Sequence, residues 1–230
     1  MSEGALDSVA VDGVKLAYRV HGDPAGPPMV LLHGLGDDER GWDPVVGELA
    51  RTHRVYGLDL RGHGASDFPG RYSFELMRDD VLGFCDRLGL DRIVLIGHSM
   101  GGTVSWLVAE ADPGRLSHLI LEDTPPPKPG NPPVPRRVRP DRPLPFDWRA
   151  VEAITAQLNA PDPAWWERAP TIRVPTLIIA GGDTSHVPQD QLADLAKRIP
   201  DARLVTIKAG HQVHTTRPAE FLAAVRKFLA

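Results

Sequence analysis

The sequence predicts an α/β fold built on a mostly parallel sheet with helices on both faces. Short apolar runs alternate with longer amphipathic stretches along most of the chain. Strands that are apolar throughout are typical of a parallel sheet covered on both faces. The chain has 230 residues, which is enough for one hydrophobic core of this kind.

The strands begin with a predicted hairpin. The runs SVAV and KLAYRV stand on either side of Asp12 and Gly13, and an Asp-Gly pair is a strong signal for a tight hairpin turn. The first two strands are therefore expected to be antiparallel. Further strands are expected at residues 29–32, 54–60, 92–97, 116–121, 175–181 and 202–207.

Amphipathic helices are expected between these strands. The clearest covers residues 73–89, where Ser73 stands at the position of an N-cap residue. The other helices of the regular pattern are expected at residues 42–50, 101–111, 189–199 and 218–229.

A proline-rich insertion interrupts the alternation. Residues 124–145 read TPPPKPGNPPVPRRVRPDRPLP, and so much proline excludes a regular helix or a central strand. Two short helices are expected after it, at 147–159 and 163–170. The sequence thus divides into a core of residues 1–123 and 171–230 and an insertion of residues 124–170.

Composition excludes several classes of function. The net charge of −4 argues against nucleic acid or a membrane surface as the main partner. The single cysteine, Cys85, cannot form an internal disulfide. The first residues lack the pattern of a secretory signal, so we expect a cytoplasmic protein. No phosphate-binding loop or metal-ligand cluster is present in the sequence, which predicts no cofactor and no metal.

The stretch GHSMG, residues 97–101, carries the strongest chemical signal. It lies between a predicted strand and a predicted helix, where a G-x-S-x-G pattern forms a nucleophile elbow. The glycines allow the two backbones to approach closely, and the helix N-terminus after Ser99 offers unpaired N–H groups. The alternative is a tight turn whose serine only caps the helix.

Four stretches of the chain together resemble the α/β-hydrolase family. They are VLLHGLGDD, DLRGHGASD, GHSMGG and AGHQVHTTRPAEF, in family order and at family-like spacing. The resemblance covers nearly all of the chain outside residues 124–170, and it implies that this insertion is a short cap over the active site.

The resemblance implies a catalytic triad. Ser99 would be the nucleophile, and His211, which follows the last predicted strand, would be its base, with His214 as the second choice. The acid of the triad is either Asp123, at the end of a strand, or Asp183, which stands one residue before the position usual in the family. The sequence slightly favours Asp123.

The remaining site residues follow from their neighbours in the chain. The N–H groups of Met100 and Leu35 would form the oxyanion hole. His33 and His98 are expected to shape the substrate site. Trp165 and Trp166 either line its opening or form the core of the cap.

The expected chemistry is hydrolysis of an ester-like bond, in an ester or lactone of a small molecule, through an acyl-enzyme on Ser99. A C–C bond hydrolase, a cofactor-free oxygenase or a non-catalytic ligand-binding protein of the same fold are the alternatives. The basic residues of 124–145 either attract an anionic substrate or belong to a solvated loop. The sequence leaves the substrate and the oligomeric state open.

Overall fold

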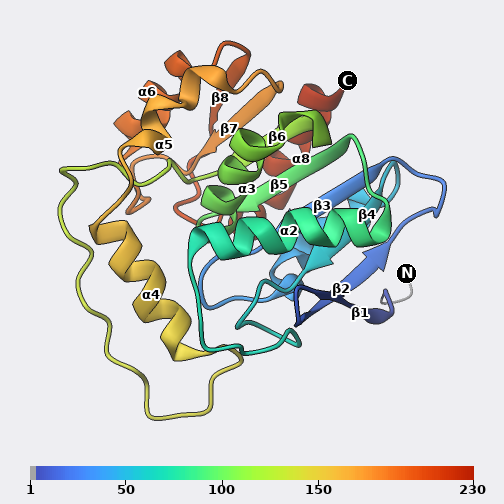
Figure 1. The fold of residues 1–230 in the computed structure, drawn as a ribbon. Coiled ribbons are helices and arrows are strands. Elements are labelled where there is room, and N and C mark those ends of the chain that lie inside the picture. Colours follow the sequence, from blue (N-terminus) through green and yellow to red (C-terminus); the bar gives the residue numbers. More distant parts are fainter. Residues whose placement is uncertain (1–3) are drawn as a thin grey trace.

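The computed structural model describes residues 4–230 and contains an eight-stranded sheet in the order β1-β2-β4-β3-β5-β6-β7-β8 (Figure 1). The β1–β2 and β2–β4 pairs are antiparallel, and the other five pairs are parallel. This mostly parallel sheet confirms the predicted fold class. The strands are β1 (Leu6–Val11), β2 (Val14–His21), β3 (Pro28–Leu32), β4 (Arg54–Leu58), β5 (Ile93–His98), β6 (Leu116–Glu122), β7 (Thr176–Ala180) and β8 (Ala202–Thr206).

The predicted hairpin is present between β1 and β2. Asp12 and Gly13 both have positive φ, 47° and 82°. Two positive φ angles in a two-residue loop match the right-handed twist of the flanking strands. The turn therefore aligns Val11 with Val14 across the pair.

Helices cover both faces of the sheet, with α2 and α3 in front and α8 behind in Figure 1. The predicted N-cap of α2 is confirmed, because the Ser73 side chain accepts a hydrogen bond from the N–H of Leu76. The helices are α1 (Asp43–Leu49), α2 (Phe74–Leu88), α3 (Met100–Ala111), α4 (Trp148–Asn159), α5 (Ala164–Glu167), α6 (Gln189–Arg198), α7 (Val213–Thr216) and α8 (Pro218–Leu229), with short 3₁₀ helices η1 (Glu39–Trp42), η2 (Pro113–Arg115) and η3 (Ala169–Thr171).

The core consists of two apolar clusters, one on each face of the sheet. Along β3, Val30 and Leu32 pack in the cluster that contains residues of α2 and α3. Met29 and Leu31, the alternate residues, pack in the cluster that contains residues of α1 and α8. Successive side chains of a strand point to opposite faces, so a run that is apolar at every position serves both clusters.

Some elements differ from the sequence expectation. The helix expected at 163–170 is two short pieces, α5 and η3, and α7 was not predicted. β8 lies at the edge of the sheet, and there Leu204 and Val205 are exposed. An edge strand has a neighbour on one side only, which the apolar pattern of ARLVTI does not reveal.

The segment between β6 and α4 has no regular helix or strand, as its prolines predict. Its backbone is nevertheless attached to the rest of the protein at several places. The N–H and C=O of Val134 pair with the side-chain amide of Asn159 in α4. At its end, the carbonyl of Pro145 accepts from the N–H of Gly64 at 2.9 Å.

The turn from β5 into α3 depends on glycine. A Cβ at Gly97 would collide with the carbonyl oxygen of Gly101 and with Oγ of Ser105. A Cβ at Gly101 would lie 2.6 Å from the carbonyl oxygen of His33. These backbones are in contact, so no methyl group fits between strand and helix.

Gly97→Ala is expected to lower the free energy of unfolding by about 1–3 kcal/mol, the usual cost of inserting a methyl group into a packed site. Gly114→Ala is the matched control, because the nearest atom to a Cβ there lies 3.6 Å away. Denaturant unfolding monitored by circular dichroism measures both. Equal stability of the two variants would contradict the close approach.

Candidate active site

Ser99 stands between β5 and α3 in a strained conformation, with φ 52° and ψ −119°. Residues with a side chain rarely adopt a positive φ, and such strain is typical of functional sites. The N–H of Ser99 donates to the carbonyl of Glu122 at 3.2 Å, and the N–H of Gly101 donates to the carbonyl of His33 at 3.1 Å. These bonds hold the turn at the carboxyl edge of the sheet, between β3 and β6.

The structure brings His211 and Asp123 together at this edge. Nδ1 of His211 donates to Oδ2 of Asp123 at 2.8 Å. The Asp123 side chain is completely buried, whereas 22% of the His211 side chain is exposed. His98, the neighbour of Ser99 in the chain, donates from Nε2 to the carbonyl of His211 at 2.9 Å. This bond ties the loop that carries His211 to the turn at Ser99.

Asp123 accepts hydrogen bonds from several donors besides His211. They are the N–H of Gly181 at 2.8 Å, Oγ of Ser185 at 2.5 Å and Nε2 of Gln189 at 3.1 Å. Burial raises the pKa of Asp123, but the hydrogen bonds, first of all the one from His211, lower it more. The net effect is a pKa below the ordinary value, which keeps the carboxylate ionised.

Asp183, the other candidate acid, is solvent-exposed in the turn after β7. The turn reaches the site through the N–H of Gly181, which donates to Asp123. Asp123 therefore occupies the position beside His211 that the sequence left open between the two residues.

Leu35 and Met100 flank the turn on its two sides. Met100 is the first residue of α3, and the N–H groups of both residues have no hydrogen-bond acceptor within residues 4–230. His33 fixes the loop that carries Leu35, because its Nε2 accepts from the N–H of Leu60 and its Nδ1 donates to the carbonyl of Gly34. Both ring nitrogens of His33 are thus occupied by backbone groups.

His98 is buried behind the turn at Ser99. Its Nδ1 has no hydrogen-bond partner in the described part of the chain, and a Cβ at Gly34 would lie 2.9 Å from this atom. Burial lowers the pKa of His98 to about 4. The ring is therefore neutral near pH 7 and supports the carbonyl of His211.

A second carboxylate–histidine pair lies beside the first. Glu122, next to Asp123 in the chain, accepts from Nδ1 of His214 at 2.7 Å and from its backbone N–H at 2.9 Å. Both side chains are buried, and the His214 ring stacks on Trp42 with centroids 4.2 Å apart. His214 is thus enclosed and holds the start of α7.

Trp165 and Trp166 are buried in the insertion. The Trp165 ring packs edge-on against Phe74 of α2, and Nε1 of Trp166 donates to the carbonyl of Pro126 at 2.8 Å. The Phe74 contact binds the insertion to the core, and the bond to Pro126 joins two parts of the insertion itself. This arrangement favours the interpretation of both tryptophans as the core of the insertion.

The sequence alone did not identify four residues near the two histidines. Glu122 was detectable as the first acid of the pair that ends β6. Ser185 and Gln189, which donate to Asp123, follow no recognisable spacing. His186 was also missed, although its ring centroid lies 4.3 Å from that of His211.

Two features are absent among residues 4–230, one of metal binding and one of membrane insertion. No cluster of three or more histidine, cysteine, aspartate or glutamate residues is arranged to hold a metal ion. No helix in the same range combines the length and apolar character needed to cross a membrane.

The fold and this edge of the sheet define an α/β hydrolase. A family model described as alpha/beta hydrolase fold matches residues 27–142. The chain belongs to this family, as the four stretches of sequence indicated.

Individual relatives differ in their chemistry. Epoxide hydrolase 3 of Xenopus tropicalis is 36% identical over 118 residues, which are 50% of this chain but only 32% of that protein. The sn-1-specific diacylglycerol lipase ABHD11 of Mus musculus is 28% identical, over 94% of this chain and 85% of its own. Among solved structures, Est816, described as an N-acyl homoserine lactone degrading enzyme, has a TM-score of 0.81 and 28% identity, covering 96% of this chain and 100% of its own.

The free energy of unfolding is expected to decrease as the pH is lowered from about 6.5 to about 4. Over this range the histidines of the unfolded chain bind protons, whereas the buried histidines of the folded protein stay neutral. Burial lowers the pKa of His98 to about 4 and that of His63 to about 3. Each should cost on the order of 2 kcal/mol of stability at about pH 4.5 relative to pH 7.5.

His98→Gln tests the part of this effect that arises at the candidate site. The glutamine amide can replace the Nε2 donor but does not titrate. Urea unfolding at both pH values should show a smaller acid loss for the variant than for the wild type. An identical loss would mean that His98 titrates normally in the folded protein.

Proposed function

We propose that this protein is a serine hydrolase that cleaves an ester-like bond, in an ester or lactone of a small molecule. Ser99 is the nucleophile, His211 the general base and Asp123 the acid that orients it. The observation that carries the proposal is the 2.8 Å hydrogen bond between His211 and Asp123, at the edge where the strained Ser99 lies. The lipase and the lactone-degrading relative support the choice of ester-like bonds.

The first step follows from the tautomer that Asp123 selects. Its carboxylate accepts a hydrogen bond from the protonated Nδ1 of His211, so Nε2 is left with a free lone pair. Nε2 takes the proton of Ser99 Oγ while Oγ attacks the carbonyl carbon. The buried Asp123 then stabilises the imidazolium ion that results.

The tetrahedral intermediate carries a negative charge on the former carbonyl oxygen. The N–H groups of Met100 and Leu35 stabilise this charge, together with the N-terminus of α3. Nε2 of His211 gives its proton to the leaving oxygen, and the C–O bond breaks. A water molecule, deprotonated by His211, then attacks the acyl-enzyme and releases the acid and Ser99.

We place the cap in residues 124–170 and the catalytic core in residues 1–123 and 171–230. The contact of Trp165 with Phe74 of the core supports a cap that is held in place. His33 and His98 act through the backbone groups that they bind, so their part is to position Leu35 and His211.

Ser99→Ala is expected to reduce kcat on 4-nitrophenyl esters of short to medium acyl length by about 10⁴–10⁶-fold, the range measured for loss of a triad nucleophile. Turnover by the wild type without a loss in Ser99→Ala would contradict the nucleophile. A wild type inert on all such esters and on lactones would contradict the ester class.

Asp123→Asn is expected to lower kcat by about 10³–10⁴-fold, because the amide can hold the wrong tautomer of His211. Asp183→Asn is the matched control and should change kcat less than about twofold, since it removes an exposed carboxylate of the same size. The same ester assay measures both. The reverse order of effects would assign the acid to Asp183.

A further inference from the structure

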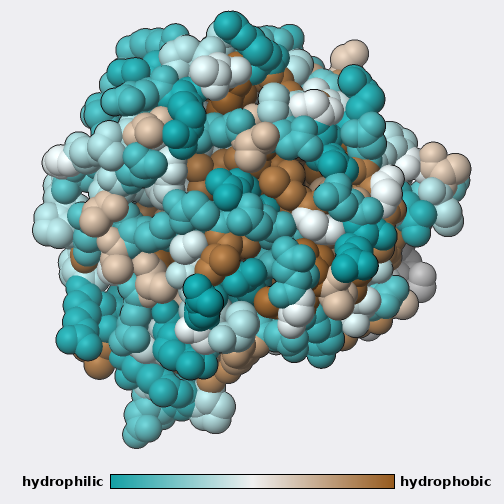
Figure 2. All heavy atoms as spheres, in the orientation of Figure 1, coloured by the Kyte–Doolittle hydropathy of each residue, from teal (hydrophilic) through white to brown (hydrophobic). Residues whose placement is uncertain are grey.

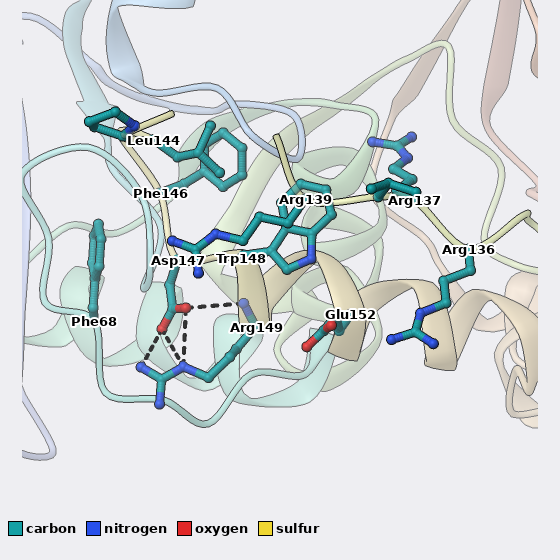
Figure 3. Close-up of a pocket in the computed structure, with 12 residues that line it drawn as sticks. Phe68, Arg136, Arg137, Arg139, Leu144, Phe146, Asp147, Trp148, Arg149 and Glu152 are labelled. Carbon is teal, nitrogen blue, oxygen red and sulfur yellow. Dashed lines mark hydrogen bonds and ion pairs between the residues drawn. The ribbon is translucent and has the colours of Figure 1, made fainter. Parts of the chain in front are cut away.

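A cavity of about 950 Å³ lies between the proline-rich segment and α4. Residues from both elements line it, and Figure 3 shows Arg139 extended across Trp148. We call it the arginine cavity. Its charged and aromatic lining includes Arg136, Arg137, Arg139, Phe146, Trp148 and Glu152.

The arginine cavity carries an excess of positive charge. Four arginines and two carboxylates line it. Arg149 and Asp147 form an ion pair, with Nη2 and Oδ2 2.6 Å apart. Among residues 4–230, no ion pair engages Arg136, Arg137 or Arg139. The protein as a whole has a net charge of −4, so this positive charge is a local feature.

Aromatic side chains form the other part of the wall. The ring of Phe146 lies 6.5 Å from that of Trp148, centroid to centroid, and Phe68, which also lines the cavity, is exposed. Figure 2 shows a mostly hydrophilic surface over this part of the protein. Guanidinium groups beside aromatic faces suit a ligand with an anionic group on an apolar or planar body.

The segment that carries the arginines is held in place. Its attachments at Val134 and Pro145 bracket the three arginines. Prolines within this stretch restrict its backbone further. Little ordering entropy is therefore lost when an anion binds, in contrast to a flexible basic loop.

The arginine cavity borders the candidate active site through Phe146. Phe146 contacts the loop that carries Leu35, because a Cβ at the next residue, Gly36, would lie 3.3 Å from the Phe146 ring. Elsewhere at the site, the ring of His186 lies against that of His211, with centroids 4.3 Å apart. Partial burial lowers the pKa of His186, and the charges of His211 and Arg137 lower it further.

We propose that the arginine cavity is a substrate subsite that binds a carboxylate or phosphate group remote from the scissile bond. The substrate is then an anionic ester or lactone whose apolar body lies against Phe146 and Trp148. This inference rests on the proposed function for the scissile bond, but the binding of the anion does not require Ser99.

The kinetic test compares two substrates of equal length, mono-4-nitrophenyl adipate, which is anionic, and its neutral methyl ester. In Arg137→Gln/Arg139→Gln, the ratio of kcat/KM for the anionic over the neutral ester should fall about tenfold or more, as expected for lost charged hydrogen bonds. Arg142→Gln is the matched control, because Arg142 is exposed in the same segment but does not line the cavity. An unchanged ratio in the double variant overturns the proposal.

The control also separates a subsite from long-range attraction. Attraction by the summed charge would respond to Arg142→Gln as well. The subsite is overturned if Arg142→Gln lowers the ratio as much as each of the two arginines does in the double variant. All substituted arginines are exposed, so unfolding midpoints should match the wild type.

The binding test uses Ser99→Ala and needs no turnover. Calorimetric titration with adipate and with phenyl phosphate should show binding that is lost when Arg137 and Arg139 are also replaced by glutamine. If neither anion binds, the subsite is overturned, even if the ester assay supports Ser99 as the nucleophile. Binding of an anion by a protein whose wild type hydrolyses no ester would support the subsite and contradict the proposed function.

Discussion

The carboxyl end of β6 is the point on which the candidate site depends. Two successive residues there, Glu122 and Asp123, each bind a histidine of the segment that follows β8: Asp123 binds His211 in the loop, and Glu122 binds His214 in α7. Successive side chains near the end of a strand point in different directions. One carboxylate therefore engages His211 at the partly exposed edge, and the other engages His214 in the interior. Together they fix the position of a loop that contains no regular structure before α7.

Both carboxylates are buried, and burial opposes their ionised form. Each is compensated by hydrogen bonds and by a histidine partner, which is the condition under which a buried charge is tolerated. The site is thus assembled from groups that are costly when unpaired. This cost favours the one arrangement in which β6, the turn after β7 and the histidine loop are all in place.

The insertion completes this arrangement from outside. Trp165 binds it to the core through Phe74. Its proline-rich part remains at the surface, where its arginines lie beside aromatic side chains. Proline permits an extended segment to keep its place without a helix or strand, because it limits the backbone directly. The sheet and helices thus supply the residues of the candidate site, and the insertion supplies a differently charged surface beside them.

The sequence by itself determined the α/β class, the hairpin, the N-cap Ser73 and the turn around Ser99, because these follow from local periodicity and from the conformations that glycine allows. It also limited the candidates for the general base to two histidines, His211 and His214. Only the tertiary structure placed Asp123 beside His211, enclosed His214 with Glu122, and brought His186 and the arginines close to the site. Those contacts join residues far apart in the chain, and their geometry depends on the order and register of the strands, which no local pattern of residues records.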